Sequence, residues 1–291
     1  MTVAVIAVPY TVGNEDLGPS RGAQILGEAF VQRAIGGASR SRLHTVVRQS
    51  AFADSASASR AVNAELATLV EARAAAGDFP LVVAGSCDAA MGVLAGFDHA
   101  RCGVVWVDAH GDFNTPDSSR SGYLPGMALA MVMGHCYRSV FEPIGFYQPV
   151  SPQHVVVIGA RDQDEPEAER LRRFAIPTVG TGGEPLGDDL RDALGRLAER
   201  VDEVYLHVDL DVLRAGLAPG IVDHPAPGGF DEEQLHAVVE TVMRGFHVRA
   251  VTVACFDPTR DPAGVARTSA LAVLATIATA AASSDPRAVA R

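Results

Sequence analysis

The segment Val104-Val105-Trp106-Val107-Asp108-Ala109-His110-Gly111-Asp112 determines the predicted fold class and points to the chemistry. Its first four residues are apolar without alternation, which is typical of a parallel strand covered on both faces. Metal-capable side chains follow directly, at Asp108, His110 and Asp112. Because alternate residues of an extended chain point the same way, these three groups should converge. Burying them without a cation would be costly, and the mixture of carboxylate and imidazole suits Mn, Fe or Zn.

Short apolar runs of the same kind recur along the chain, with helical patterns between them. Strands are expected at Val3–Val8, Leu43–Arg48, Leu81–Ala84, Val104–Val107, Val155–Ile158, Val204–Val208 and Ala250–Val253. Helices are expected at Ser20–Arg33, Ser57–Ala76, Glu165–Phe174, Asp188–Val201, Asp231–Arg244 and Thr268–Ala282. Ser20, Asp231 and Thr268 suit N-cap positions. The alternation predicts an α/β fold, with a parallel sheet covered by helices on both faces, and residues 1–291 form a single predicted domain.

Composition excludes several classes of protein. The 291 residues are 48% hydrophobic and 20% charged, as expected for a soluble globular protein with a sizeable core. All 24 basic residues are Arg, which excludes a Schiff-base Lys, a Ser–Lys dyad and a P-loop Lys. The net charge of −11 disfavours nucleic acid as a partner. The sequence contains no run of about 18 apolar residues, so we expect no transmembrane helix. We expect a cytoplasmic protein whose four Cys are thiols.

Two further strand ends carry candidate ligands. Asp209 and Asp211 follow the expected strand Val204–Val208, and His207 lies on the same face. A lone Asp-x-Asp is more often a capping or solvated turn, but two such clusters at neighbouring strand ends favour one shared site. Four Asp and one His could neutralise two divalent ions. Cys87 follows a third strand and could add a thiolate, although a free Cys is more often simply buried.

Four segments together resemble the ureohydrolases, the superfamily of arginase and agmatinase. Ala84–Gly92 resembles their Gly-Gly-Asp-His-Ser segment, and Asp108–Asn114 resembles their Asp-Ala-His-x-Asp motif. His207–Val212 resembles their Asp-x-Asp strand, and Ala160–Asp164 resembles a loop of arginase proper. The match runs from Gly18–Arg21 to about Asp261, nearly the whole chain. The resemblance implies a three-layer α/β/α domain and a hydrolase that acts on linear amidines.

The resemblance also implies a binuclear manganese centre of six residues: Cys87, Asp108, His110, Asp112, Asp209 and Asp211. Asp108 and Asp209 would bridge the ions, Cys87 and Asp112 would complete one ion, and the remaining two residues would complete the other. In the family a hydroxide between the metals, hydrogen-bonded to the residue matching Asp112, attacks the guanidine carbon, which makes Asp112 a catalytic candidate. Family members range from monomers to hexamers, so homo-oligomerisation stays open.

The chain departs from the arginase pattern at three positions. Cys87 stands where most members have His, and its softer thiolate makes Zn or Fe more competitive with Mn. A few relatives carry this Cys, among them the Nω-hydroxy-L-arginine amidinohydrolases. Pro125 replaces a His that helps to protonate the departing amine. His207 is a candidate for that catalytic task, but a supporting or packing role is equally open. Cys255 replaces a Glu that holds the guanidinium.

The remaining recognition positions match arginase. Asn114 and Ser121 match residues that hold the α-carboxylate of the substrate, and Asp164 matches one that faces the α-amino group. Without the resemblance, Asn114 could merely shape a turn and Asp164 could merely cap a helix. The sequence therefore predicts an amidinohydrolase for a small guanidino substrate, N-hydroxyarginine or arginine. Alternatives are an agmatinase-like or formiminoglutamase-like hydrolase, a deacetylase (disfavoured because no His-His pair occurs), and a non-enzymatic metal-binding or assembly protein.

Overall fold

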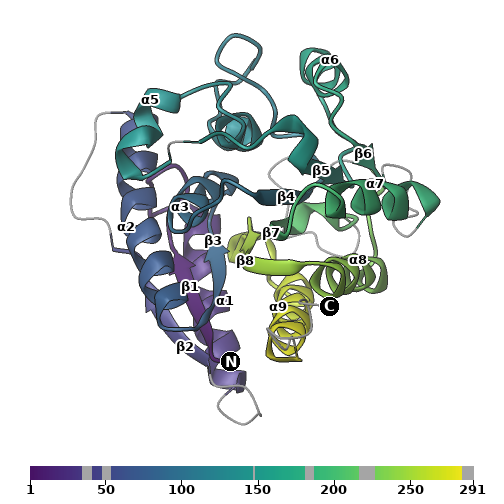
Figure 1. Ribbon diagram of the computed structural model, residues 1–291. Coiled ribbons are helices and arrows are strands. Elements are labelled where there is room, and N and C mark those ends of the chain that lie inside the picture. The colour runs from purple at the N-terminus through teal and green to yellow at the C-terminus, as the bar shows by residue number, and fades with distance from the viewer. Residues whose placement is uncertain (35–40, 48–53, 147, 181–186, 216–226, 284–291) are drawn as a thin grey trace.

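The computed structural model describes residues 1–34, 41–47, 54–146, 148–180, 187–215 and 227–283 (Figure 1). Its strands form one sheet in the order β2-β1-β3-β8-β7-β4-β5-β6, and every pairing is parallel. The strands are β1 (Val3–Val8), β2 (Ser41–Thr45), β3 (Phe79–Ala84), β4 (Cys102–Val107), β5 (Val155–Ile158), β6 (Thr178–Val179), β7 (Glu203–Asp209) and β8 (His247–Ala254). The predicted α/β class with a parallel sheet is confirmed.

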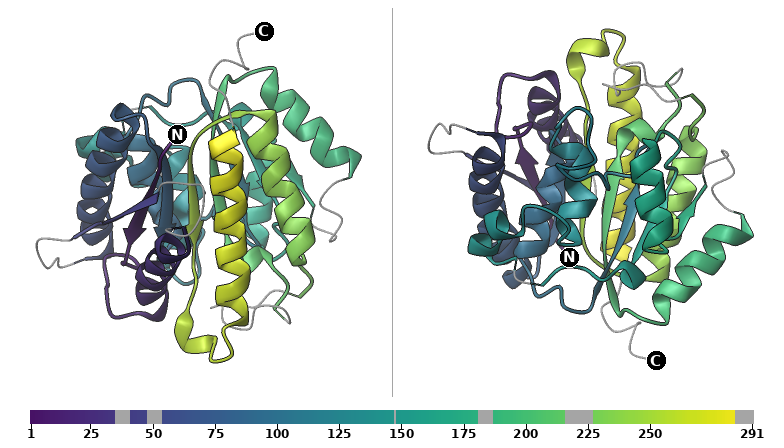
Figure 2. Two further views of the ribbon diagram at one scale, coloured as in Figure 1. Left: turned by 90° about the horizontal axis from the view of Figure 1, so that it is seen from below. Right: turned by 90° about the horizontal axis from the view of Figure 1, so that it is seen from above.

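Helices cover both faces of the sheet, as Figure 2 shows. The described helices are α1 (Gly18–Ala34), α2 (Ser55–Ala75), α3 (Ala90–Ala95), α4 (Ala128–Val132), α5 (Arg138–Phe141), α6 (Glu165–Arg173), α7 (Asp188–Ala198), α8 (Glu232–Gly245) and α9 (Val265–Ser283). One buried core lies between the sheet and α1, α7, α8 and α9, and a second lies between the sheet and α2 to α6. Alternate strand residues enter opposite cores, as Val105 and Trp106 do, which explains why each central strand is apolar throughout.

Most predicted elements form, and the differences are local. β6 was not predicted, because a strand of two residues leaves no pattern. Arg48, the predicted end of the second strand, lies outside the described residues. Asp231 caps α8 with a reciprocal capping box, as predicted. The N-caps predicted at Ser20 and Thr268 are wrong, because α1 begins at Gly18 and α9 at Val265. Ser20 instead donates to the Asn14 carbonyl oxygen at 2.6 Å.

The helix α9 is long and apolar enough to cross a membrane, and within the described ranges no other helix meets that criterion. Its most apolar window has a mean hydropathy of 1.5, and half of that window is buried inside the protein. Leu271, Leu274 and Ile277 enter the core that α9 shares with α1 and α8. Packing in the core therefore accounts for the apolar composition of this helix.

The strand order creates a crevice at the carboxyl ends of the central strands. After β3 the chain crosses to β4, and β8 and β7 are later inserted between them. Open parallel sheets bind ligands outside the carboxyl ends at such a switch point. A hollow of about 860 Å³ lies at the opposite end, lined by residues such as Phe79 and His247. The described groups of metal-capable side chains do not line that hollow, so the chemistry is expected at the carboxyl ends.

Candidate metal centre

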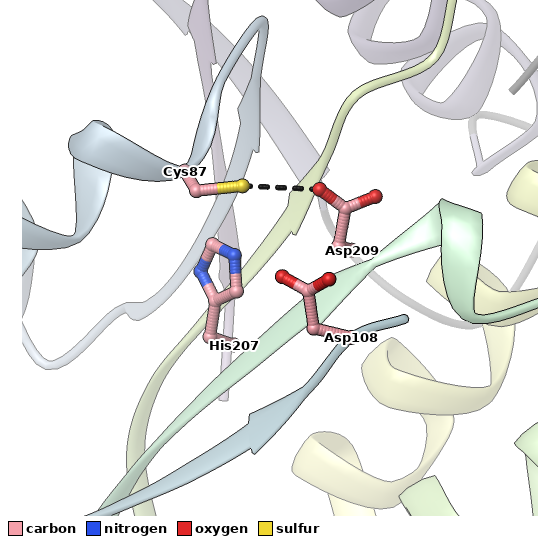
Figure 3. A group of neighbouring side chains, drawn as sticks. All are labelled: Cys87, Asp108, His207 and Asp209. Atoms are coloured by element: carbon pink, nitrogen blue, oxygen red, sulfur yellow. Dashed lines mark hydrogen bonds between the residues drawn. The ribbon is translucent and has the colours of Figure 1, made fainter. Parts of the chain in front are cut away.

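Side chains from β3, β7 and β4 meet at the crevice (Figure 3). Cys87 begins a short 3-10 helix after β3, Asp108 follows β4, and Asp209 ends β7. The Cys87 thiol donates to Oδ2 of Asp209 at 3.0 Å. The register of β4 and β7 pairs Trp106 with His207, so the residues two positions later on each strand, Asp108 and Asp209, also lie side by side.

Two groups of potential ligands form here, and each has its ligand atoms within 4.8 Å of one another. The first group contains Cys87, Asp108, His207 and Asp209, all buried. The second group contains Asp108, His110 and Asp211. Asp108 belongs to both groups, as expected of a bridging ligand, whereas Asp209, the other predicted bridge, belongs only to the first. The structure thus brings together five of the six residues predicted to bind metal, and it adds His207.

The second group is held by hydrogen bonds within the strand ends. Asp108 accepts from the backbone N–H of His110 at 2.7 Å, and Asp211 accepts from the backbone N–H of Ala109 at 3.0 Å. The Nδ1 atom of His110 lies 2.9 Å from Oδ2 of Asp211 and 3.4 Å from Oδ1 of Asp108. Burial alone would lower the pKa of His110, but these two carboxylates raise it.

Asp112 is the predicted ligand that lies outside both groups. It is buried, and its φ of +47° places it in the left-handed region. Among the described residues its Oδ2 atom has no hydrogen-bond partner. Burial and the neighbouring Asp108 raise the pKa of Asp112 well above its usual range. A strained, unpaired carboxylate beside the centre is consistent with function, but metal binding by Asp112 stays a prediction.

The electrostatics of the centre fit a pair of cations. Burial raises the pKa of Asp108 to about 6, with the nearby Asp211 as the next cause. Burial and the same neighbour also raise the pKa of Asp209. Within the described part of the chain, no Arg forms an ion pair with Asp108, Asp112 or Asp209. His110 is the titratable base beside Asp108, and no such partner pairs with Asp112 or Asp209 in the described residues. Divalent cations would supply the counter-charge that these carboxylates need.

Cys255 extends the centre on its thiol side. It follows β8 with a φ of +72°, again in the left-handed region. Its sulfur lies 3.6 Å from the sulfur of Cys87. The hydrogen bond with Cys255, followed by burial, raises the pKa of Cys87 well above its usual range. Two positions that depart from the arginase pattern are therefore in contact.

His207, predicted as a catalytic candidate, is fully buried in the first group. Its ring stacks on Trp106 with centroids 3.8 Å apart and an interplanar angle of 12°. Nδ1 lies 3.1 Å from the hydroxyl oxygen of Tyr205, whereas Nε2 has no hydrogen-bond partner within the described ranges. Burial lowers the pKa of His207 to about 3, so the ring is neutral. The proton-donor role predicted for His207 stays untested.

The three predicted substrate-binding residues lie in the loops that follow β4 and β5. Asn114 follows Asp112 closely, and its Oδ1 accepts from the hydroxyl of Ser118 at 2.9 Å. Ser121 is exposed, and its hydroxyl oxygen accepts from the backbone N–H of Tyr123 at 3.1 Å. Asp164 occupies the N-cap position of α6, but its side chain makes no capping bond and lies 3.7 Å from Arg120. Helix capping therefore does not explain Asp164.

Sequence reasoning missed two buried acids that support the centre. Asp88 accepts hydrogen bonds from the hydroxyls of Ser59 and Ser86 and so fixes the turn that presents Cys87. Glu167, on α6, accepts from the backbone N–H of Phe113 at 2.8 Å. Burial raises the pKa of Glu167 to about 7. The sequence did offer weak signals for both acids. Asp88 directly follows Cys87, and Glu167 lies four residues before the apolar Leu171, which places the two on the same face of the predicted helix.

A buried, acidic centre with two groups of potential ligands at the switch point of a parallel sheet defines the class: an α/β protein with a candidate site for divalent cations. Residues 1–281 match the family model described as the arginase family, and the chain belongs to that family. The family assigns it to the hydrolases that act on linear amidines, the enzyme class predicted from the sequence.

Individual relatives support this assignment. The chain is 33% identical over 220 residues to an arginase of Bacillus caldovelox, covering 74% of this chain and 73% of that protein. It is 31% identical over 186 residues to an N(omega)-hydroxy-L-arginine amidinohydrolase of Streptomyces lavendulae, covering 60% of this chain and 62% of the relative. The structure of Bacillus subtilis arginase superposes with a TM-score of 0.85 at 28% identity, covering 96% of this chain and 98% of that one.

Proposed function

We propose that the protein is a metal-dependent amidinohydrolase that cleaves a guanidino C–N bond of an arginine-like amino acid, with N-hydroxyarginine favoured over arginine. The observation that carries the preference is the position of Cys255 beside Cys87. By resemblance, arginases have at this position a Glu that holds the guanidinium. A neutral thiol cannot pair with a guanidinium, which is costly to bury without a carboxylate. The less basic N-hydroxyguanidine loses less when this carboxylate partner is absent.

The residues fit a two-metal hydrolysis. Cys87, Asp108 and Asp209 would hold one ion, and Asp108, His110 and Asp211 would hold the other. When bound, two divalent cations would activate water for attack and stabilise the developing negative charge. Asp112 offers an unpaired, buried Oδ2 next to the ligand groups, so as a carboxylate it can take a proton from the attacking water. Because Pro125 has no titratable group, we assign the return of that proton to the departing amine to Asp112.

The loops would select an α-amino acid. The Oδ1 of Asn114 is occupied by Ser118, so its amide NH₂ group remains to donate to the α-carboxylate of the substrate. The exposed hydroxyl of Ser121 can donate to the same carboxylate. Asp164, which does not cap its helix, can pair with the α-ammonium group. A substrate without the α-carboxylate, such as agmatine, would lose part of this recognition.

The decisive experiment offers the metal-loaded protein arginine, N-hydroxyarginine, agmatine and formiminoglutamate, with Mn²⁺, Zn²⁺ and Co²⁺ tested separately. Mass spectrometry should detect ornithine with hydroxyurea from N-hydroxyarginine, faster than ornithine with urea from arginine. Turnover of agmatine or formiminoglutamate in preference to both amino acids would refute the proposed substrate. No turnover of any compound by the fully loaded protein would favour the non-enzymatic alternative.

A matched pair of variants tests the role of Cys255. Cys255→Glu supplies a carboxylate and should shift the ratio of kcat/KM toward arginine by roughly ten- to a hundredfold, the value of a hydrogen bond to a charged group. Cys255→Ser keeps the side chain neutral and should leave the ratio near that of the unaltered protein. Equal ratios in the two variants would show that this position does not contact the guanidino group.

A further inference from the structure

We propose that His207 is a fourth protein ligand, through Nε2, of the metal position formed by Cys87, Asp108 and Asp209. The resulting set of thiolate, imidazole and two carboxylates would select Zn²⁺, Co²⁺ or Fe²⁺ over Mn²⁺ at this position. The inference rests on the proposed metal centre and is independent of the substrate.

The direction of the ring supports ligation. In Figure 3 one ring nitrogen of His207 points toward the gap between the sulfur of Cys87 and the carboxylates of Asp108 and Asp209, and the other points away. The potential ligand atoms of these four residues lie within 4.8 Å of one another. The nitrogen that points away is Nδ1, since Nδ1 contacts the hydroxyl of Tyr205. Nε2 is therefore the atom that faces the gap.

The hydrogen bonds behind the ring set its tautomer. The hydroxyl of Tyr205 has one proton, which it donates to Oγ1 of Thr252 at 2.8 Å. The same oxygen lies 3.1 Å from Nδ1 of His207, so Nδ1 carries the hydrogen and donates it to Tyr205. Nε2 then presents a lone pair to the gap. Metal-binding His residues are oriented in the same way, by a hydrogen bond from the nitrogen that does not bind the metal.

Burial makes the unpaired lone pair informative. His207 has no exposed surface, and its stacking on Trp106 prevents the ring from turning toward another partner. Among the described residues nothing forms a hydrogen bond with Nε2. An unsatisfied buried acceptor is destabilising, and a cation in the gap would satisfy it. The same tautomer leaves no proton on Nε2 for a departing amine, so ligation replaces the role of proton donor for His207.

The test uses the full-length protein loaded with Co²⁺ and read by paramagnetically shifted NMR. Each metal-bound imidazole keeps one N–H, so two shifted exchangeable signals are expected, from His207 and His110. The signal of the fully buried His207 should exchange slowly in D₂O. His110→Ala should remove the other signal and keep the slow one. A single signal in the unaltered protein, lost in His110→Ala, would overturn the proposal.

Variants supply an independent readout in Zn²⁺ affinity, measured by competition with a chelator. His207→Phe keeps a ring against Trp106 and should raise the Kd of one Zn²⁺ roughly a hundredfold or more, and the slow NMR signal should vanish. Tyr205→Phe keeps His207 but removes the acceptor of Nδ1–H, together with the hydrogen bond to Thr252, and should raise the same Kd about tenfold. Unchanged Zn²⁺ binding in folded His207→Phe would overturn the proposal. If His207→Phe does not fold, Tyr205→Phe and the unaltered protein still decide. None of these readouts needs substrate turnover, so the proposed function can fail separately.

Discussion

The two sides of the metal centre share Asp108 but differ in chemistry. The carboxylate side, Asp108, His110 and Asp211, matches the Asp-Ala-His and Asp-x-Asp motifs of the family, and the side chain of His110 is 25% exposed. The thiol side, Cys87, His207 and Cys255, contains two departures from the arginase pattern and a fully buried imidazole. One side thus resembles an ordinary oxygen-rich manganese position, and the other has softer ligands.

The comparison shows that the two cysteine departures belong to one structural unit. Cys87 and Cys255 are 168 residues apart in the chain, but their sulfurs lie 3.6 Å apart because β3 and β8 are neighbours in the sheet. Metal preference, proposed for Cys87, and guanidinium recognition, proposed for Cys255, would therefore change at the same place. We therefore expect a softer metal at the thiol side to occur together with a preference for a less basic substrate.

The largest effect should come from the residue that both sides share. Asp108→Asn removes one carboxylate from both ligand groups and should abolish stable binding of both ions, with kcat reduced by roughly a thousandfold or more. Elemental analysis and turnover measure this loss, and the exposed Asp192→Asn, on α7, is the matched control. If Asp108→Asn lost only one ion, the two sides would not share a bridging ligand.

Replacing Cys87 should make the ligands of the thiol side as hard as those of the carboxylate side. Cys87→His restores the residue that most ureohydrolases have and should keep two ions while lowering the preference for Zn²⁺ over Mn²⁺ by roughly tenfold or more. Metal content after equilibration with equal concentrations of the two ions measures the change. Cys102→Ser, at a buried thiol outside both ligand groups, is the control. An unchanged preference in Cys87→His would show that the thiol does not bind metal.

The sequence predicted the carboxylate side better than the thiol side for a physical reason. Asp108 and His110, like Asp209 and Asp211, are close neighbours in the chain, so strand periodicity alone brings each pair together. The approach of Cys87 to Cys255 depends on the order of strands in the sheet, which no local pattern contains. The orientation of the His207 ring likewise depends on its stacking on Trp106 and its hydrogen bond with Tyr205, which no local pattern contains.

Local pattern also explains which fold details were missed. The apolar runs predicted the central strands, but the two-residue β6 is too short to give a pattern. Thr268 was predicted as an N-cap from its residue type, but it lies inside α9, and its hydroxyl donates at 2.8 Å to the carbonyl oxygen of Gly264, the residue before the helix. Asp88 and Glu167 were missed because buried acids look like surface residues in a sequence.

These two buried acids allow a smaller test of each side separately. Asp88 supports the thiol side, since it accepts from Ser59 and Ser86 next to Cys87. Asp88→Asn keeps the shape but weakens these hydrogen bonds, and it should weaken Zn²⁺ binding about tenfold at one position only. Chelator competition with stoichiometry measures this, against the exposed Asp192→Asn. Equal weakening of both ions would mean that Asp88 supports the whole fold and not one side.

Glu167 supports the carboxylate side, and its titration should make the stability of the fold depend on pH. In the metal-free protein burial raises its pKa to about 7, whereas the ordinary value is 4.5. A raised carboxyl pKa means that the folded state holds the proton more tightly, so stability is greatest below pH 4.5 and is lost as the pH rises through about 7. Glu167→Gln cannot ionise and still accepts from the backbone N–H of Phe113. Its stability relative to the unaltered protein should therefore rise between pH 4.5 and 8, by up to about 3 kcal/mol.

Denaturant unfolding of both proteins in chelator, at several pH values, measures the difference. Asp209 titrates in both proteins and its contribution cancels in the comparison, whereas Asp108 and Asp112 interact with Glu167, so their response to its charge is part of the measured difference. Glu169→Gln, an exposed neighbour on α6, should show no such trend. A difference that stays flat with pH would mean that Glu167 is already ionised in the fold. The carboxylate side would then carry one more buried negative charge, and its demand for cations would be greater than that of the thiol side.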